Sequence, residues 1–246
     1  HRLNIPTLLM ADIIHGFRTI FPIPLALGST WDEAAVEKMA EISAKEAAVS
    51  GLHVTFSPMV DLVRDPRWGR VMESTGEDPL LNSRLAAAMV RGYQGENLKE
   101  DNWRVAACVK HFAAYGGALA GRDYNTVDMS ERQLREMYLP GYKAGLDAGA
   151  KLVMTSFNTV DGIPATGNQW LFRDVLRNEF GFEGVVISDW GAIKELIPHG
   201  VAKDEKQAAE LAIKAGVDIE MMTTCYPDYL KELLEEGRIA ETLIDE

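Results

Sequence analysis

The fold of this chain is predicted first from the stretch Gly184-Val185-Val186-Ile187-Ser188-Asp189-Trp190-Gly191. Three β-branched residues follow the first glycine, and a short apolar run of this kind predicts a strand buried on both faces. The run ends at Asp189, and α/β proteins place reactive groups at the C-terminal ends of such strands. An aspartate in this position could equally cap a following helix. The stretch alone leaves both interpretations open.

Similar apolar runs recur along the chain and alternate with segments of helical character. We expect strands at residues 5–11, 54–57, 105–109, 152–156, 184–187 and 217–221. We expect helices at residues 32–51, from Pro79 to about Gln94, from Ser130 onward, and at 170–180, 204–215 and 229–235. This alternation predicts parallel strands wrapped by helices. Because polar, irregular sequence follows each strand, a TIM-type (β/α) barrel fits better than a doubly wound sheet.

The expected barrel is incomplete or irregular, because six strands are visible where a closed barrel has eight. The 246 residues fit one α/β domain that spans residues 1–246. The chain begins with a histidine and not with methionine. We therefore expect it to be a fragment of a longer multidomain protein.

Composition excludes several classes of function. The formal net charge of −12 argues against a surface for nucleic acid or for an anionic membrane. No apolar run is long enough to span a bilayer. The two cysteines, Cys108 and Cys225, form neither a disulfide framework nor a metal-ligand pattern. His53, His111 and His199 are not spaced as a metal site either, so we expect no metal and no cofactor.

A parallel barrel brings the C-terminal ends of all its strands to one rim, where mixed chemistry would meet. Carboxylates and cations arranged in a ring suit a neutral polyol, since each sugar hydroxyl both donates and accepts hydrogen bonds. Aromatic faces such as those of Trp68 and Trp190 suit the apolar face of a pyranose. The candidate binding and catalytic residues at this rim are Asp12, Arg70, Lys110, His111, Met154, Asp189 and Trp190.

Structural interpretations of the same residues stay open. Lys110 and His111 could form an ion pair that only stabilises the rim. Arg64, Asp65 and Arg67 could form a salt-bridge network within the long loop that follows the second strand.

The order of several motifs resembles glycoside hydrolase family 3. The matching pieces are Asp12-x-x-His15-Gly16-Phe17-Arg18-Thr19, Phe21-Pro22-Ile23-Pro24, Arg64-Asp65-Pro66-Arg67-Trp68-Gly69-Arg70, Gly76-Glu77-Asp78-Pro79, Lys110-His111-Phe112-Ala113-Ala114-Tyr115-Gly116, Gly121-Arg122-Asp123-Tyr124-Asn125-Thr126-Val127-Asp128 and Ser188-Asp189-Trp190-Gly191. They run in the family's order across nearly the whole chain. The chain is most similar to the N-terminal catalytic barrel of the bacterial β-glucosidase branch.

This resemblance implies a retaining glycosidase with Asp189 as nucleophile, acting on a terminal β-D-glucosyl residue of an oligosaccharide or aryl β-glycoside. Asp12, Arg70, Lys110 and His111 would hold the sugar hydroxyls. Trp190 would form a wall on the side of the leaving group, and the strand that contains Met154 would contribute to the same site. A β-xylosidase or arabinosidase of the same family stays an alternative. The compartment, whether cytoplasmic, periplasmic or secreted in a bacterium, stays open.

Three features qualify the resemblance. Many relatives carry tyrosine where this chain has Phe157, so a hydroxyl near the nucleophile is missing. The loop after Phe112 contains no histidine, which disfavours N-acetylglucosaminides. In relatives the acid/base glutamate comes from a C-terminal domain, which we expect to be the missing partner here. Glu73 and Glu77 are the weaker candidates within the chain.

Two rival functions predict different observations. An aldolase-like enzyme would form a Schiff base on Lys110 and needs a phosphate-binding turn after the last strands, which residues 220–226 do not offer. A carbohydrate-binding barrel without turnover would keep the sugar contacts but would not need a nucleophile.

Overall fold

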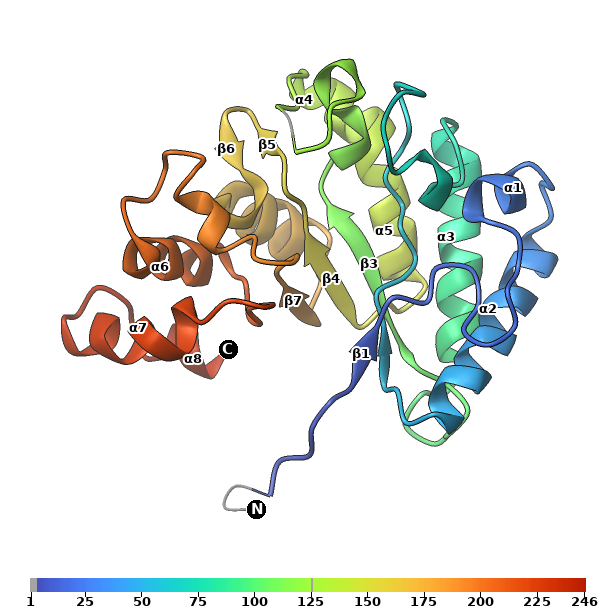
Figure 1. The fold of residues 1–246 in the computed structure, drawn as a ribbon, viewed down its shortest axis with the longest axis horizontal. Coiled ribbons are helices and arrows are strands. Elements are labelled where there is room, and N and C mark those ends of the chain that lie inside the picture. Colours follow the sequence, from blue (N-terminus) through green and yellow to red (C-terminus); the bar gives the residue numbers. More distant parts are fainter. Residues whose placement is uncertain (1–3, 125) are drawn as a thin grey trace.

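The computed structural model describes residues 4–124 and 126–246. Five strands form one parallel sheet in the order β1-β2-β3-β4-β7 (Figure 1). Their bounds are β1 Met10–Ala11, β2 Val54–Thr55, β3 Ala106–Phe112, β4 Leu152–Thr155 and β7 Val185–Ile187. A separate antiparallel hairpin, β5 Thr159–Val160 and β6 Ile163–Pro164, follows β4. The strands curve into half of a barrel, which confirms the expected incomplete TIM-type fold.

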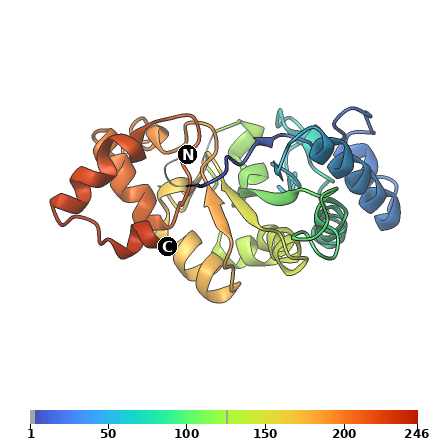
Figure 2. The ribbon, with the colours of Figure 1, turned by 90° about the horizontal axis from the view of Figure 1, so that it is seen from below.

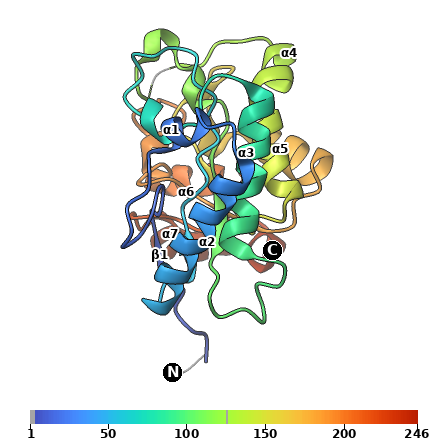
Figure 3. The ribbon, with the colours of Figure 1, turned by 90° about the vertical axis from the view of Figure 1, so that its right-hand side faces the viewer.

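Helices pack along the outside of this half-barrel. Their bounds are α1 Pro24–Gly28, α2 Glu33–Val49, α3 Pro79–Gln94, α4 Glu131–Gln133, α5 Leu139–Asp147, α6 Glu205–Ala215, α7 Cys225–Glu235 and α8 Thr242–Asp245, with a further helical segment over Trp170–Glu179. Figure 2 shows the sheet between the α2–α3 side and the α6–α7 side. Figure 3 shows α2 and α3 side by side on one flank.

Side-chain capping explains where several helices begin. The carboxylate of Asp32 accepts a hydrogen bond from the Ala35 N–H at 3.0 Å, so α2 starts where the sequence predicts it. The hydroxyl of Ser130 accepts from the Gln133 N–H at 3.2 Å and opens the run from α4 to α5. The predicted helix starts are therefore confirmed at these two positions.

Alternation along the strands separates two apolar layers. On β3, Ala107 and Val109 face the helices and join the large core, whereas Ala106 and Cys108 belong to a smaller cluster on the opposite, inner face. This period of two is what a pleated strand requires. The inner cluster also contains Val54, Leu152, Met154, Ile187 and Ile219. The same alternation carries Lys110 to the inner side, two residues beyond Cys108.

Two of the predicted strands are much shorter than expected. Only Met10–Ala11 of residues 5–11 is a strand, and Ile5 and Leu8 are 70% and 56% exposed. The reason is pairing: β1 contacts β2 alone, and β2 begins at Val54, opposite Met10. Residues before this point have no neighbouring strand among the described residues.

The predicted sixth strand, residues 217–221, is reduced to a single parallel bridge between Ile187 and Ile219. The N–H of Met221 donates to the hydroxyl of Ser188 at 2.8 Å, and not to a backbone carbonyl. The side chain thus interrupts the ladder. None of the described helices is long and apolar enough to cross a membrane.

Candidate active site

Asp189 lies two residues after the end of β7 and is 8% exposed. Its Oδ1 accepts a hydrogen bond from the Trp190 N–H at 2.6 Å. Its Oδ2 is buried and has no hydrogen-bond partner among the described residues. Helix capping would bond the carboxylate to an N–H two or three residues further on, which is not what this side chain does. One oxygen is therefore fixed by the backbone and the other is free to react.

Lys110 links two elements at the rim. Its ammonium, with a side chain 3% exposed, donates to Oδ1 of Asp12 at 2.6 Å and lies 3.9 Å from Glu73. The Asp12 side chain is 62% exposed, so its carboxylate projects toward the solvent-filled side of the rim. The short contact with Asp12 fixes the orientation of this ammonium.

Arg70 occupies the neighbouring position. Its guanidinium makes two hydrogen bonds to Glu73, at 2.7 and 3.0 Å. The carboxylates of Glu73, Asp61 and Asp189 raise the pKa of Arg70 against the opposing effect of burial. Glu73 thus bridges Arg70 and Lys110, and the predicted rim residues Asp12, Arg70 and Lys110 form one continuous chain of charges.

His111 is 1% exposed and connects this chain to Asp189. Its Nε2 lies 3.4 Å from Oδ2 of Asp189, without hydrogen-bond geometry, and its Nδ1 lies 2.7 Å from Oδ2 of Asp61. Burial lowers the pKa of His111 to about 3, so the imidazole is neutral at ordinary pH. The structure thus places His111 against Asp189, and the roles of Lys110, His111 and Asp189 stay predictions.

Asp61 and Tyr142 are site residues that sequence reasoning missed. Asp61 is completely buried, and the Tyr142 hydroxyl lies 2.6 Å from its Oδ1. A signal for Asp61 was present, because it is the one charged residue in the apolar run 59–63. Tyr142 lies in α5, distant in sequence, and had no comparable signal.

An aromatic cluster supports the site from behind. Trp68 packs edge-on against Tyr115 with ring centroids 5.2 Å apart, and Arg70 lies over the Tyr115 ring at 5.6 Å. Gly116 belongs to the same packing, because a Cβ there would lie 2.3 Å from the Leu62 carbonyl oxygen. Trp68 is only 2% exposed and its Nε1–H donates to Asp123 at 3.0 Å. The expectation that Trp68 offers a face to a sugar is therefore wrong, because packing already covers its ring.

The remaining predictions separate into two groups. Trp190 is 62% exposed beside Asp189, as a wall for a ligand requires. Met154 is 3% exposed and packs in the inner apolar cluster with Cys108 and Ile187, which places it beneath the rim. Its contact with a substrate stays a prediction.

The loop charges divide as well. Arg67 is 71% exposed and pairs with Asp65 at 2.6 Å, which supports the loop-stabilising interpretation for these two residues. Arg70 does not take part in this loop pair, because its guanidinium contacts Glu73 instead. Within the described ranges no group of three or more histidine, cysteine or acidic side chains is placed to hold a metal ion.

The whole chain, residues 1–246, matches the family described as the glycosyl hydrolase family 3 N-terminal domain, and the chain belongs to this family. It is 49% identical over 245 residues to a periplasmic beta-glucosidase from Salmonella typhimurium, with 100% of this chain and 32% of that protein covered. It is 36% identical over 265 residues to a beta-xylosidase from Formosa agariphila, with coverage of 100% and 37%.

Solved structures agree with this relationship. A crystal structure of a β-glucosidase from Listeria innocua in complex with isofagomine superposes with a TM-score of 0.99 at 64% identity, covering 100% of this chain and 34% of that one. A mutant of the same enzyme in complex with laminaribiose gives a TM-score of 0.98 over 99% of this chain. The chain thus spans about a third of the length of these relatives.

Proposed function

We propose that the protein containing this chain hydrolyses terminal β-D-glucosyl residues by a retaining, double-displacement mechanism. The observation that carries this proposal is the state of Asp189, whose Oδ1 is fixed by a backbone N–H while its buried Oδ2 is unpartnered. A nucleophilic carboxylate needs one oxygen free to attack the anomeric carbon. The similarity to β-glucosidases supports this activity over that of a β-xylosidase, since the xylosidase relative is the less similar protein.

The charges around Asp189 fit the reaction. Lys110 and Arg70 supply positive charge at the same rim as Asp189. Asp12, Arg70, Lys110 and His111 present both donors and acceptors, which is what sugar hydroxyls require. Hydrogen bonds to these hydroxyls that tighten as the oxocarbenium-like transition state forms would contribute to rate as well as to binding. Trp190 would face the leaving group.

We further propose that these 246 residues form one domain of a longer polypeptide, and that the general acid/base lies outside them. Glu73 is bonded to Arg70 through both carboxylate oxygens and is thereby committed to positioning. Glu77 is exposed. Neither arrangement fits a group that must protonate a leaving oxygen beside Asp189. The name of the Salmonella relative favours the periplasm among the compartments considered.

The experiment that tests this function is a substrate panel on the complete polypeptide. Aryl β-glucoside, β-xyloside and α-arabinoside would be compared by kcat/KM, and the first-formed sugar anomer would be identified by proton NMR. We expect the β-glucoside to be preferred and the β anomer to appear first. An α anomer appearing first would exclude the retaining mechanism, and preference for the xyloside would replace the proposed substrate class.

A further inference from the structure

Asp61 is a buried carboxyl next to the site that has no route to a substrate. It is 0% exposed and lies in the segment between β2 and α3. Its Oδ2 accepts the backbone N–H of His111 at 3.1 Å and lies 2.7 Å from Nδ1 of the same residue. The Tyr142 hydroxyl lies 2.6 Å from its Oδ1. All contacts of this carboxyl are thus directed at His111 and the residue behind it.

A count of protons restricts the state of this network. The Tyr142 oxygen lies 2.6 Å from both Oδ1 of Asp61 and the backbone oxygen of His111. A phenol carries one proton and can donate to only one of these acceptors at a time. The second short contact is satisfied when Asp61 carries a proton on Oδ1 and donates it to Tyr142. Burial raises the pKa of Asp61 to about 6, which favours this arrangement.

The same count fixes the tautomer of His111. With its proton on Oδ1, Asp61 offers Oδ2 only as an acceptor, and this oxygen receives both N–H groups of His111. Ionisation of Asp61 leaves Oδ2 an acceptor as well. The proton of the neutral imidazole is therefore on Nδ1, and Nε2 carries a lone pair.

The distance to the nucleophile agrees with this assignment. Nε2 of His111 lies 3.4 Å from Oδ2 of Asp189 without hydrogen-bond geometry, and that oxygen has no partner among the described residues. The contact is long and misaligned, so His111 leaves the oxygen that has to attack unengaged. It is compatible with a lone pair on Nε2, and the contacts of Nδ1 are what place the proton.

We propose that Asp61 is a positioning residue that holds the proton of His111 on Nδ1, so that Nε2 accepts a hydrogen bond from a sugar hydroxyl and Oδ2 of Asp189 stays free. This inference rests on the proposed glycosidase function. It assigns the site a preference for a sugar hydroxyl that donates a hydrogen bond to Nε2 of His111. The titratable and charged groups that face His111 are Asp61, Asp189, Arg70, Lys110 and Glu73.

The tautomer is measured directly by nitrogen-15 NMR of the histidine rings in the complete protein. The chain contributes five histidines, and His111 would be assigned by the loss of its signals in His111→Gln. We expect a proton on Nδ1 and none on Nε2 at neutral pH. A proton on Nε2 would overturn the inference. This measurement needs no turnover, so its outcome is independent of the proposed activity.

Two variants of Asp61 separate positioning from packing. Asp61→Asn keeps an oxygen for the Nδ1–H and can place its amide toward Tyr142, whereas Asp61→Leu removes the acceptor at similar size. We expect kcat/KM in Asp61→Leu to fall roughly 10- to 100-fold, as is typical when a buried polar group loses its partner. Asp61→Asn should lose at least tenfold less and should keep the Nδ1–H signal. An unchanged tautomer in folded Asp61→Leu would contradict the inference. If that variant does not fold, the wild-type spectrum still decides.

Substituted substrates test the direction of the hydrogen bond. Aryl β-glucosides with one hydroxyl at position 3, 4 or 6 replaced by hydrogen or by fluorine would be compared in wild type and His111→Ala. Fluorine accepts but does not donate, so at the contacted position it should be no better than hydrogen in wild type. Recovery of rate by fluorine that disappears in His111→Ala would show that Nε2 donates. Absence of turnover on every glucoside would defeat the proposed function and leave the NMR result standing.

Discussion

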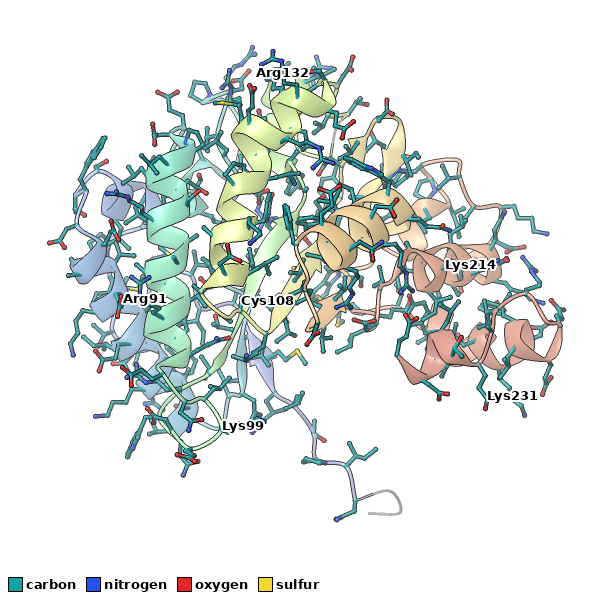
Figure 4. All side chains as sticks on the ribbon, turned by 180° about the vertical axis from the view of Figure 1, so that it is seen from behind. Arg91, Lys99, Cys108, Arg132, Lys214 and Lys231 are labelled. Carbon is teal, nitrogen blue, oxygen red and sulfur yellow. The ribbon has the colours of Figure 1, made fainter. Side chains whose placement is uncertain are left out.

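Two ion pairs of similar length lie in different surroundings. At the C-terminal end of the sheet Lys110 pairs with Asp12 at 2.6 Å, and between α3 and α2 Arg91 pairs with Glu37 at 2.8 Å. The lysine side chain is 3% exposed and the arginine side chain is 46% exposed. Figure 4 shows Arg91 on α3, at about the height of Cys108 in β3. Contact distance is nearly equal in the two pairs, so burial is what distinguishes them.

The largest effect should come from Asp189, the proposed nucleophile, which is buried beside the first pair. Asp189→Asn in the complete protein should lower kcat by about 10³-fold or more, because the covalent route is closed. Steady-state kinetics on an aryl β-glucoside would measure this loss, with circular dichroism as the control for folding. Activity within about tenfold of wild type would show that Asp189 is not the nucleophile.

The next effect compares the two pairs directly. Lys110→Met and Arg70→Met should each lower kcat/KM. The corresponding loss of transition-state stabilisation should be roughly 1–3 kcal/mol or more, because a charged hydrogen bond is lost. Arg91→Met is the matched control in the exposed pair. Kinetics unchanged in Lys110→Met, with only thermal stability reduced, would support the interpretation that this residue merely stabilises the rim.

A third effect concerns pH and the network behind the rim. Burial raises the pKa of Asp61 from 3.8 to about 6, so this carboxyl stabilises the fold below pH 3.8 and loses that contribution as pH rises through 6. Burial lowers the pKa of His111 from 6.5 to about 3, so its contribution is present above pH 6.5 and is lost as pH falls toward 3. Between pH 4 and 6 the free energy of unfolding falls with pH because of Asp61 and rises with pH because of His111. The two changes nearly cancel.

Asp61→Asn removes the contribution of Asp61 to the pH dependence of the free energy of unfolding. Its free energy of unfolding should rise with pH between about 4 and 6 more steeply than that of wild type, by roughly 1.4 kcal/mol per pH unit. Urea unfolding of both proteins across this range would measure the difference. Parallel pH profiles would mean that Asp61 and His111 do not titrate as described.

The smallest effect should come from the exposed pair between α3 and α2. Arg91→Met should change the free energy of unfolding by less than about 1 kcal/mol, because a solvent-exposed ion pair is screened. Its kcat/KM should equal that of wild type. A loss of activity comparable to that of Lys110→Met would contradict the distinction between the two pairs.

The sequence predicts a strand well where a run of residues becomes buried. It predicts strand length poorly where the length depends on a neighbouring strand. The run from Val185 to Ile187 forms the predicted strand, in which Val186 and Ile187 are buried and Val185 is exposed. Residues 5–9 contain three large apolar side chains, but they extend beyond the start of β2 and stay exposed. Strand length depends on a neighbour whose position is not encoded locally.

The site shows the same division. Lys110, His111 and Asp189 follow predicted strands, so a parallel sheet had to bring them together. Tyr142 reaches Asp61 from a helix 81 residues away, and this contact depends on how α5 packs against the sheet. Trp68 was misjudged for a related reason, since only the packed aromatic cluster shows that its ring is covered.

In the proposed reaction the unpartnered oxygen of Asp189 forms the covalent bond to the sugar. This bond can be detected by treating the complete protein with an activated 2-deoxy-2-fluoro β-glucoside, digesting it and locating the added sugar by mass spectrometry. We predict that the label lies on the peptide containing Ser188-Asp189-Trp190. A label on any other carboxylate, including that of Glu73, would contradict the assignment.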